Sequence, residues 1–131
     1  MEGTIGPNGP SPSVTLQLES LLSMQREGRY EDVQNRCKAL YESEKHQMDN
    51  AAAILKCWAN VLVCLGTYDV AIGHFKQASE LFANRGNNQE SWYCADAART
   101  VQERESLPVE FVEFVRTTSG GTLDYPRNFP Q

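Results

Sequence analysis

The feature that most restricts the fold of this chain is an internal repeat with a spacing of 38 residues. Residues 27–33 and 65–71 both have a glycine in the second position and a tyrosine in the fourth. Gly28 and Gly66 each follow an apolar periodic segment, and glycine lets a chain reverse direction without a steric penalty from Cβ. The repeat therefore predicts two successive helical hairpins of similar design.

Apolar residues recur at steps of three and four in several segments, which is the pattern of amphipathic helices. Helices are expected over residues 13–27, 31–45, 49–65, 69–82 and 89–104, with a short sixth helix over 109–115. Ser13 is the expected N-cap of the first helix, and Asp49 or Asn50 that of the third. Gly86 is suited to a left-handed helix end. No segment has the alternation or the β-branched density typical of a strand.

The two tryptophans are expected to lie in the core. Trp58 occupies a repeat-defining position in the third helix. In the fifth helix, Trp92, Ala95, Ala98 and Val101 are spaced to form one apolar stripe.

The chain length fits one domain with tails at both ends. A chain of 131 residues is long enough for a single core. Residues 1–12 are rich in glycine and proline and are expected to form a flexible leader. Residues 117–131 have the same character, so the helical domain is predicted to span 13–116.

The charge pattern excludes several classes of function. The net charge is −5, and no segment gathers lysine and arginine, so neither nucleic acid nor an anionic membrane is an expected partner. The first residues lack the pattern of a secretory signal, and no stretch approaches the ~20 apolar residues of a membrane span. Four cysteines without a Cys-x-x-Cys pair then favour reduced thiols in the cytoplasm, or in the nucleus.

Residues 52–83 resemble a tetratricopeptide repeat (TPR), whose signature combines large and small residues at fixed helical positions. The matching residues are Leu55, Trp58, Ala59 and Leu62 in the first helix, Gly66 and Tyr68 in the turn, and Ala71, Phe75 and Ala78 in the second helix. Residues 14–46 match more loosely, and 87–104 resemble the first helix of a third unit. About two and a half repeats imply an all-α fold of antiparallel hairpins, stacked as a short right-handed superhelix of five to six helices.

The TPR resemblance also implies a concave groove lined by the first helix of each repeat. The residues expected there are Leu18, Leu22 and Arg26 from the first repeat, and Ala53, Lys56, Asn60, Val63 and Cys64 from the second. This mixed apolar and polar surface suits a partner peptide or helix. The alternative is that several of these residues pack on a neighbouring helix. TPR proteins that bind the acidic C-termini of chaperones use lysines and asparagines in the groove, and only Asn60 agrees with that pattern.

The segment 109–115 is unusually apolar for a chain terminus. Phe111 and Phe114 stand beside Val112 and Val115, and a short helix with this much apolar surface needs a cover. It is expected to cap the last hairpin, and the alternative is a docking surface for another chain. The leading hypothesis is a protein-interaction adaptor or a subunit of a larger complex. The second is a small assembly factor that forms a homodimer or a larger oligomer through Phe111 and Phe114.

A third hypothesis, an enzyme or metal protein, uses Cys57, Cys64 and His74. Zinc needs about four ligands with short chelating spacings, which these residues do not provide. Buried cysteines are common core residues. No catalytic residue, cofactor or metal is therefore expected.

Overall fold

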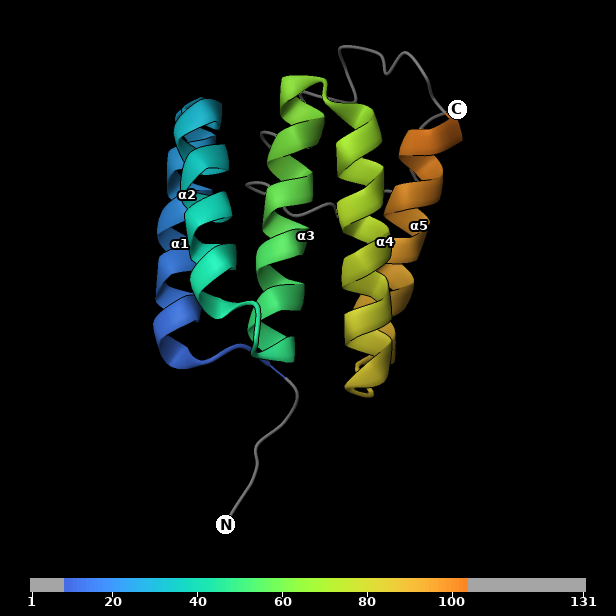
Figure 1. Cartoon of the computed structure of the whole chain (residues 1–131). Coiled ribbons are helices and arrows are strands. Elements are labelled where there is room, and N and C mark those ends of the chain that lie inside the picture. The colour runs from blue at the N-terminus through green and yellow to red at the C-terminus, as the bar shows by residue number, and fades with distance from the viewer. Residues whose placement is uncertain (1–8, 104–131) are drawn as a thin grey trace.

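The computed structural model describes residues 9–103, which fold into five α-helices joined by short turns (Figure 1). The helices are α1 (Pro12–Arg26), α2 (Tyr30–Glu44), α3 (Met48–Leu65), α4 (Tyr68–Asn84) and α5 (Asn88–Glu103). Successive helices run antiparallel and pack against their neighbours in sequence order. The predicted all-α stack of helical hairpins is thus confirmed, and residues 9–103 contain no strand.

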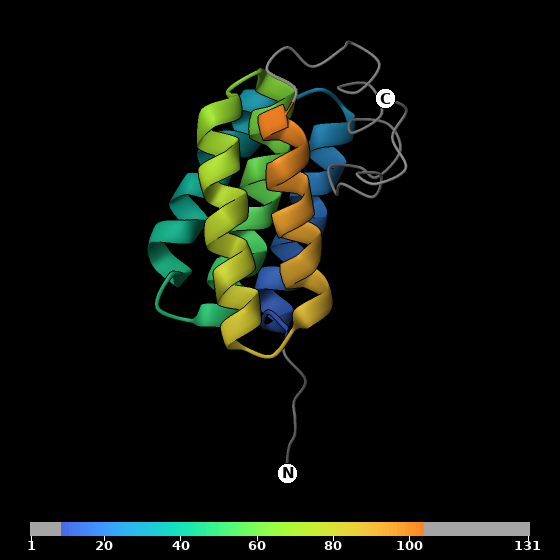
Figure 2. The same cartoon turned by 90° about the vertical axis from the view of Figure 1, so that its right-hand side faces the viewer.

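The helices form two layers around α3. Seen along the stack, α1 and α5 lie toward one side and α2 and α4 toward the other (Figure 2). The helix α3 lies between α2 and α4 in the stack and contributes eleven buried residues, more than any other helix. The expectation that no stretch approaches a membrane span is wrong for α3, which by length and composition is apolar enough to cross a bilayer. Most of α3 is enclosed by other helices, as in the central helix of a folded core.

Three of the four turns have the same glycine geometry. Gly28, Gly66 and Gly86 have φ angles of +83°, +79° and +80°, which residues with a Cβ rarely adopt. After α3, the Thr67 N–H donates to the Leu62 carbonyl at 2.9 Å. Equivalent bonds of 3.1 Å and 2.9 Å close the turns after α1 and α4. These are Schellman ends, which satisfy helix carbonyls that otherwise have no partner. Gly86 therefore ends its helix in the left-handed conformation expected from the sequence.

The helix starts differ from the expected caps. Helix α1 begins at Pro12, and Ser11 is its N-cap in place of Ser13, because extended backbone at Ser11 lets its side chain accept from the Val14 N–H. Proline at the first helical position lacks only an N–H that would have no partner there. Gln47 precedes α3, and its side chain makes no cap hydrogen bond.

Asn50 lies inside the first turn of α3, and its side chain bonds to other parts of the chain instead of capping the helix. Its Oδ1 accepts from the Ser11 N–H at 2.8 Å, and its Nδ2 donates to Glu44 at 3.0 Å. Asn50 therefore joins the start of α1 to the end of α2.

The core forms where large side chains meet small ones. Ala59, Ala71 and Ala78 are fully buried and let α3 and α4 approach closely, while Phe75 fills the space between them. A smaller cluster joins α1, α2 and α3 through residues such as Leu21, Val33 and Val61.

The buried face of α5 differs from the expected stripe. Cys94, Ala97, Ala98 and Val101 are buried, whereas Ala95 is exposed and Trp92 is 48% exposed. The prediction of Trp92 as a core residue is therefore wrong. Helix α5 turns its small residues toward α4, because only small side chains permit the close contact that these two helices make.

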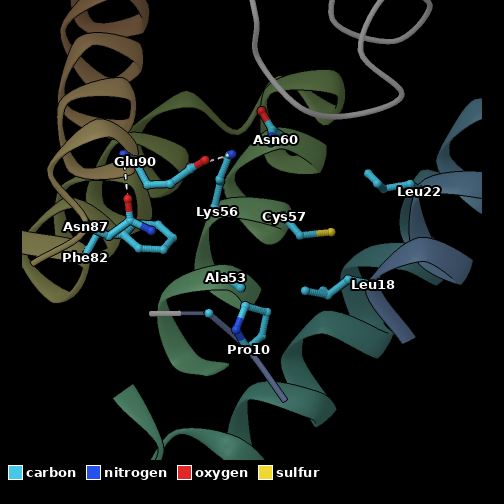
Figure 3. A pocket seen from close by; sticks show the side chains of 11 residues that line it. Pro10, Leu18, Leu22, Ala53, Lys56, Cys57, Asn60, Phe82, Asn87 and Glu90 are labelled. Carbon is cyan, nitrogen blue, oxygen red and sulfur yellow. Dashed lines mark hydrogen bonds and ion pairs between the residues drawn. The ribbon is translucent and has the colours of Figure 1, made fainter. Parts of the chain in front are cut away.

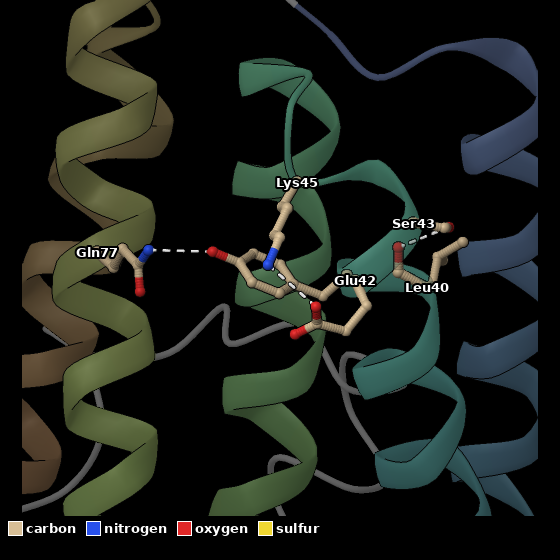
Figure 4. A network of polar contacts seen from close by, with 6 residues as sticks. Leu40, Glu42, Ser43, Lys45 and Gln77 are labelled. Carbon is tan, nitrogen blue, oxygen red and sulfur yellow. Dashed lines mark hydrogen bonds and ion pairs between the residues drawn. The ribbon is translucent and has the colours of Figure 1, made fainter.

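A hydrogen bond connects α2 and α4 across the side of the stack that they share (Figure 4). Gln77 Nε2 donates to the Tyr41 hydroxyl at 3.2 Å. Tyr41 also lies against Trp58, which is half-buried and packs on both core clusters as expected. On α2, Lys45 pairs with Glu42 at 3.0 Å, an exposed contact that adds little stability. Residues 1–8 of the predicted leader, the predicted helix 109–115 and the predicted tail 117–131 lie outside the described residues.

Candidate partner-binding groove

A cavity of about 340 Å³ opens between α1 and α5, with α3 as its floor (Figure 3). We call it the groove. Its lining residues are Gly9, Pro10, Leu18, Leu22, Ala53, Lys56, Cys57, Asn60, Phe82, Asn87 and Glu90. The volume lies near the lower end of the range for ligand pockets. The groove is therefore wide enough for one or two large side chains.

One side of the groove is apolar. Leu18 and Leu22 are one helical turn apart on α1, and both point across the opening toward α3 (Figure 3). Both are half-buried, and Pro10 continues this side toward the chain start. On the floor, Ala53 leaves room above the α3 backbone. Such a surface gains free energy when an apolar side chain covers it.

The opposite side is polar but electrically balanced. Lys56 Nζ forms an ion pair with Glu90 at 2.7 Å, and their side chains are 16% and 33% exposed. The Lys56 ammonium also lies 4.8 Å from the centre of the Tyr93 ring. Asn87 fixes the start of α5 by accepting from the Glu90 N–H. Among the lining residues that the structure describes, Lys56 and Glu90 are the two charged ones, so together these residues give the groove no net charge.

Asn60 is the least satisfied polar group in the groove. Its side chain is fully buried, yet neither Nδ2 nor Oδ1 has a hydrogen-bond partner. Nearly all buried polar groups in proteins are hydrogen-bonded, so an amide with two unpartnered atoms needs an explanation. The amide lies beneath the groove surface, so a bound molecule supplies the missing acceptor and donor only when the surrounding side chains move to uncover it.

Cys57 lies on the floor beside Ala53 and is 7% exposed. Its sulfur is 3.8 Å from the sulfur of Cys37 on α2, which is fully buried. The hydrogen bond with Cys57 and burial both raise the pKa of the Cys37 thiol far above its usual range. Burial likewise raises the pKa of Cys94 to about 12. Both thiols therefore stay protonated and are poor nucleophiles.

The residues of the metal or enzyme hypothesis have separate structural contacts. Cys64 accepts a hydrogen bond from Gln25 Nε2 at 3.6 Å. His74 packs edge-on against Trp58, with ring centres 4.3 Å apart, and burial lowers its pKa. In the part of the chain from 9 to 103, no three His, Cys, Asp or Glu side chains gather as metal ligands.

Five of the residues predicted for the groove line it: Leu18, Leu22, Ala53, Lys56 and Asn60. The other predicted positions lie elsewhere. Val63 is fully buried in the core, and its expected groove position is wrong, because α3 is covered on more sides than an outer helix of a stack. Arg26 is exposed at the end of α1, and Cys64 contacts Gln25; neither lines the groove. Phe111 and Phe114 lie outside the described residues.

Sequence reasoning missed Cys57 and five residues from outside α1 and α3. Cys57 is one turn from Ala53, so the helical period alone could have placed it on the floor. Gly9 and Pro10 precede α1, and Phe82, Asn87 and Glu90 come from the end of α4, the α4–α5 turn and the start of α5. The positions of these last three residues depend on how α5 packs on α4 beside α3, for which the sequence carries no local signal.

Comparison of the chain with protein-family models, with curated proteins and with solved structures found no match. Membership of the TPR family therefore stays a prediction from the residue pattern.

Proposed function

We propose that this chain is a TPR-like protein-interaction module that binds a peptide or helix of a partner protein in the groove, as an adaptor or as a subunit of a larger complex. The observation that carries the proposal is the fully buried, unpartnered amide of Asn60 in a groove with an apolar side. A peptide group offers both a carbonyl acceptor and an N–H donor, which are the two partners that this amide lacks, and it reaches them once the side chains around Asn60 move to uncover the amide.

The chemistry of the groove favours a particular class of partner. Leu18 and Leu22 suit apolar side chains at helical or extended spacing. Lys56 is already neutralised by Glu90, so an acidic tail or a nucleic-acid phosphate gains little there. The proposed partner is therefore an uncharged apolar segment of a protein.

The proposal includes no catalytic step, cofactor or metal. The high pKa values of Cys37 and Cys94 support this, because protonated thiols are neither nucleophiles nor metal ligands. The proposed location remains the cytoplasm or nucleus.

The test compares two glutamate substitutions on the same helix. Leu22 lines the groove, whereas Leu16 is 66% exposed on α1 and does not. Full-length wild type, Leu22→Glu and Leu16→Glu are used as baits in quantitative affinity purification, with circular dichroism as the check on folding. A groove partner is expected to be lost with Leu22→Glu and kept with Leu16→Glu.

Partners that meet this criterion are then purified and titrated directly. A buried leucine contact worth about 1.4 kcal/mol or more corresponds to at least a tenfold weaker Kd. Equal recovery of every partner by the two folded variants would contradict the proposal.

A further inference from the structure

The sequence contains an apolar segment a few residues after the end of α5. Helix α5 is described up to Glu103, and residues 109–115 contain two phenylalanines and three valines. At the helical period, Phe111, Phe114 and Val115 share one face, and Glu110 and Glu113 fall on the other. This pattern is complementary to a site with an apolar side and no net charge.

The length of the chain allows this segment to reach the groove. The path back along α5 from Glu103 to Glu90 is roughly 20 Å at about 1.5 Å per residue. An extended chain covers about 3.3 Å per residue, so residues 104–110 span roughly 23 Å. Phe111 can therefore reach the level of Lys56 and Glu90 without any change in the helices.

We propose that residues 109–115 of the same chain dock in the groove, with Phe111 and Phe114 against Leu18 and Leu22, and that a partner binds by displacing them. This inference rests on the proposed function, because the docked segment regulates binding only if a partner protein competes with it for the groove.

Tethering favours this occupant over a second copy or a free peptide. A short linker gives a local concentration in the millimolar range, and closing a loop of this length costs little more than closing a shorter one. An untethered segment with the same contacts has to be present at a similar concentration to compete. Docking also covers apolar side chains that would otherwise meet water.

The first test is nuclear magnetic resonance on the full chain at a concentration where light scattering shows a monomer. Leucine and valine methyl groups are labelled, and nuclear Overhauser effects (NOEs) from the ring protons of Phe111 and Phe114 to the methyls of Leu18 and Leu22 are expected. A mixture of labelled and unlabelled chains separates contacts within one chain from contacts between two. Contacts only between chains would assign the groove to a second copy and overturn the proposal.

The second test uses Cys57, on the groove floor, as a reporter of occupancy. Full chains are treated with a neutral maleimide, and the modification of Cys57 is followed by mass spectrometry. If the segment fills the groove nine-tenths of the time, the double variant Phe111→Glu/Phe114→Glu frees it and labelling accelerates about tenfold. Phe129→Glu, which changes an aromatic residue outside the segment, is expected to label like the wild type.

Absence of the intrachain NOEs, together with equal labelling rates in all three chains, would refute docking by residues 109–115. That outcome leaves the partner-binding proposal standing, because the comparison of Leu22→Glu with Leu16→Glu tests it separately. Conversely, docking without any partner lost from Leu22→Glu would show a groove used only by the chain itself.

Discussion

Helix α3 carries two buried asparagines in opposite states, and replacing each by leucine is expected to change stability in opposite directions. Asn50 is 5% exposed and uses both amide atoms, one with the Ser11 N–H and one with Glu44. Asn60 is fully buried and uses neither. The pair shares a helix, a residue type and a burial class, so each variant controls for the other.

The magnitudes follow from the hydrogen bonds. A buried amide without a partner costs about 1–3 kcal/mol, and Asn60→Leu removes that cost while the adjoining groove gives room for the larger side chain. Asn60→Leu is thus expected to raise the free energy of unfolding by about 1–3 kcal/mol. Asn50→Leu removes two hydrogen bonds and leaves Glu44 and the Ser11 N–H without them, with an expected loss of about 1–3 kcal/mol.

Urea unfolding followed by circular dichroism measures both changes. At an m-value of about 2 kcal/mol/M, a separation of 2 kcal/mol moves the two midpoints apart by roughly 1 M. Asn60→Leu is also expected to weaken partner binding, because under the proposed function Asn60 serves recognition at the expense of stability. A destabilised Asn60→Leu with an unchanged m-value would refute the view that the native fold leaves this amide unsatisfied.

Three further predictions concern the turns, the pH dependence and the ion pair. Gly66→Ala is expected to lower the free energy of unfolding by about 1 kcal/mol because Gly66 has a positive φ. Gly73→Ala is expected to raise it by about 0.5–1 kcal/mol, because Gly73 lies inside α4 with open space around it. Thermal unfolding of both variants tests the two signs. Burial lowers the pKa of His74, so the unfolded chain binds the proton more readily, and stability is expected to fall as the pH drops below about 6.5. Urea midpoints across this range are expected to vary less with pH in His74→Phe, and an unchanged profile would exclude His74 as the cause. Lys56→Met leaves the partly exposed Glu90 carboxylate unpaired and is expected to lower the free energy of unfolding by about 1–2 kcal/mol. The double variant Lys56→Met/Glu90→Leu is expected to recover most of this loss. Equal stability of the two variants in urea would count against a coupled pair.

The sequence predicts the helices well because their signals are local. Glycines at the ends of periodic segments marked three of the turns, and α2 and α4 begin and end within two residues of the expected bounds. The cap of α1 was misplaced because Ser11 and Ser13 both suit an N-cap, and the choice depends on the hydrogen bond between the Ser11 N–H and Asn50, 39 residues away.

The faces of the helices were harder to predict than their positions. In α5 the large Trp92 suggested a buried stripe, but contact with α4 selects the small residues Ala97 and Ala98. The floor of the groove follows from the helical period, as Lys56 and Asn60 show. The contributions of Phe82 and Glu90 depend on the packing of α5 on α4 beside α3, which is a property of the assembled helices.

The shallow attachment of α1 has a consequence for recognition. Helix α1 packs less closely on its neighbours, α2 and α3, than any other helix packs on its own neighbours, so it has the fewest interactions to lose when it tilts. The side of the groove that carries Leu18 and Leu22, helix α1, can therefore move more easily than its floor, helix α3. If the groove binds partners as proposed, a tilt of α1 alone would admit apolar segments of different size, while the residues of α3 would keep their positions.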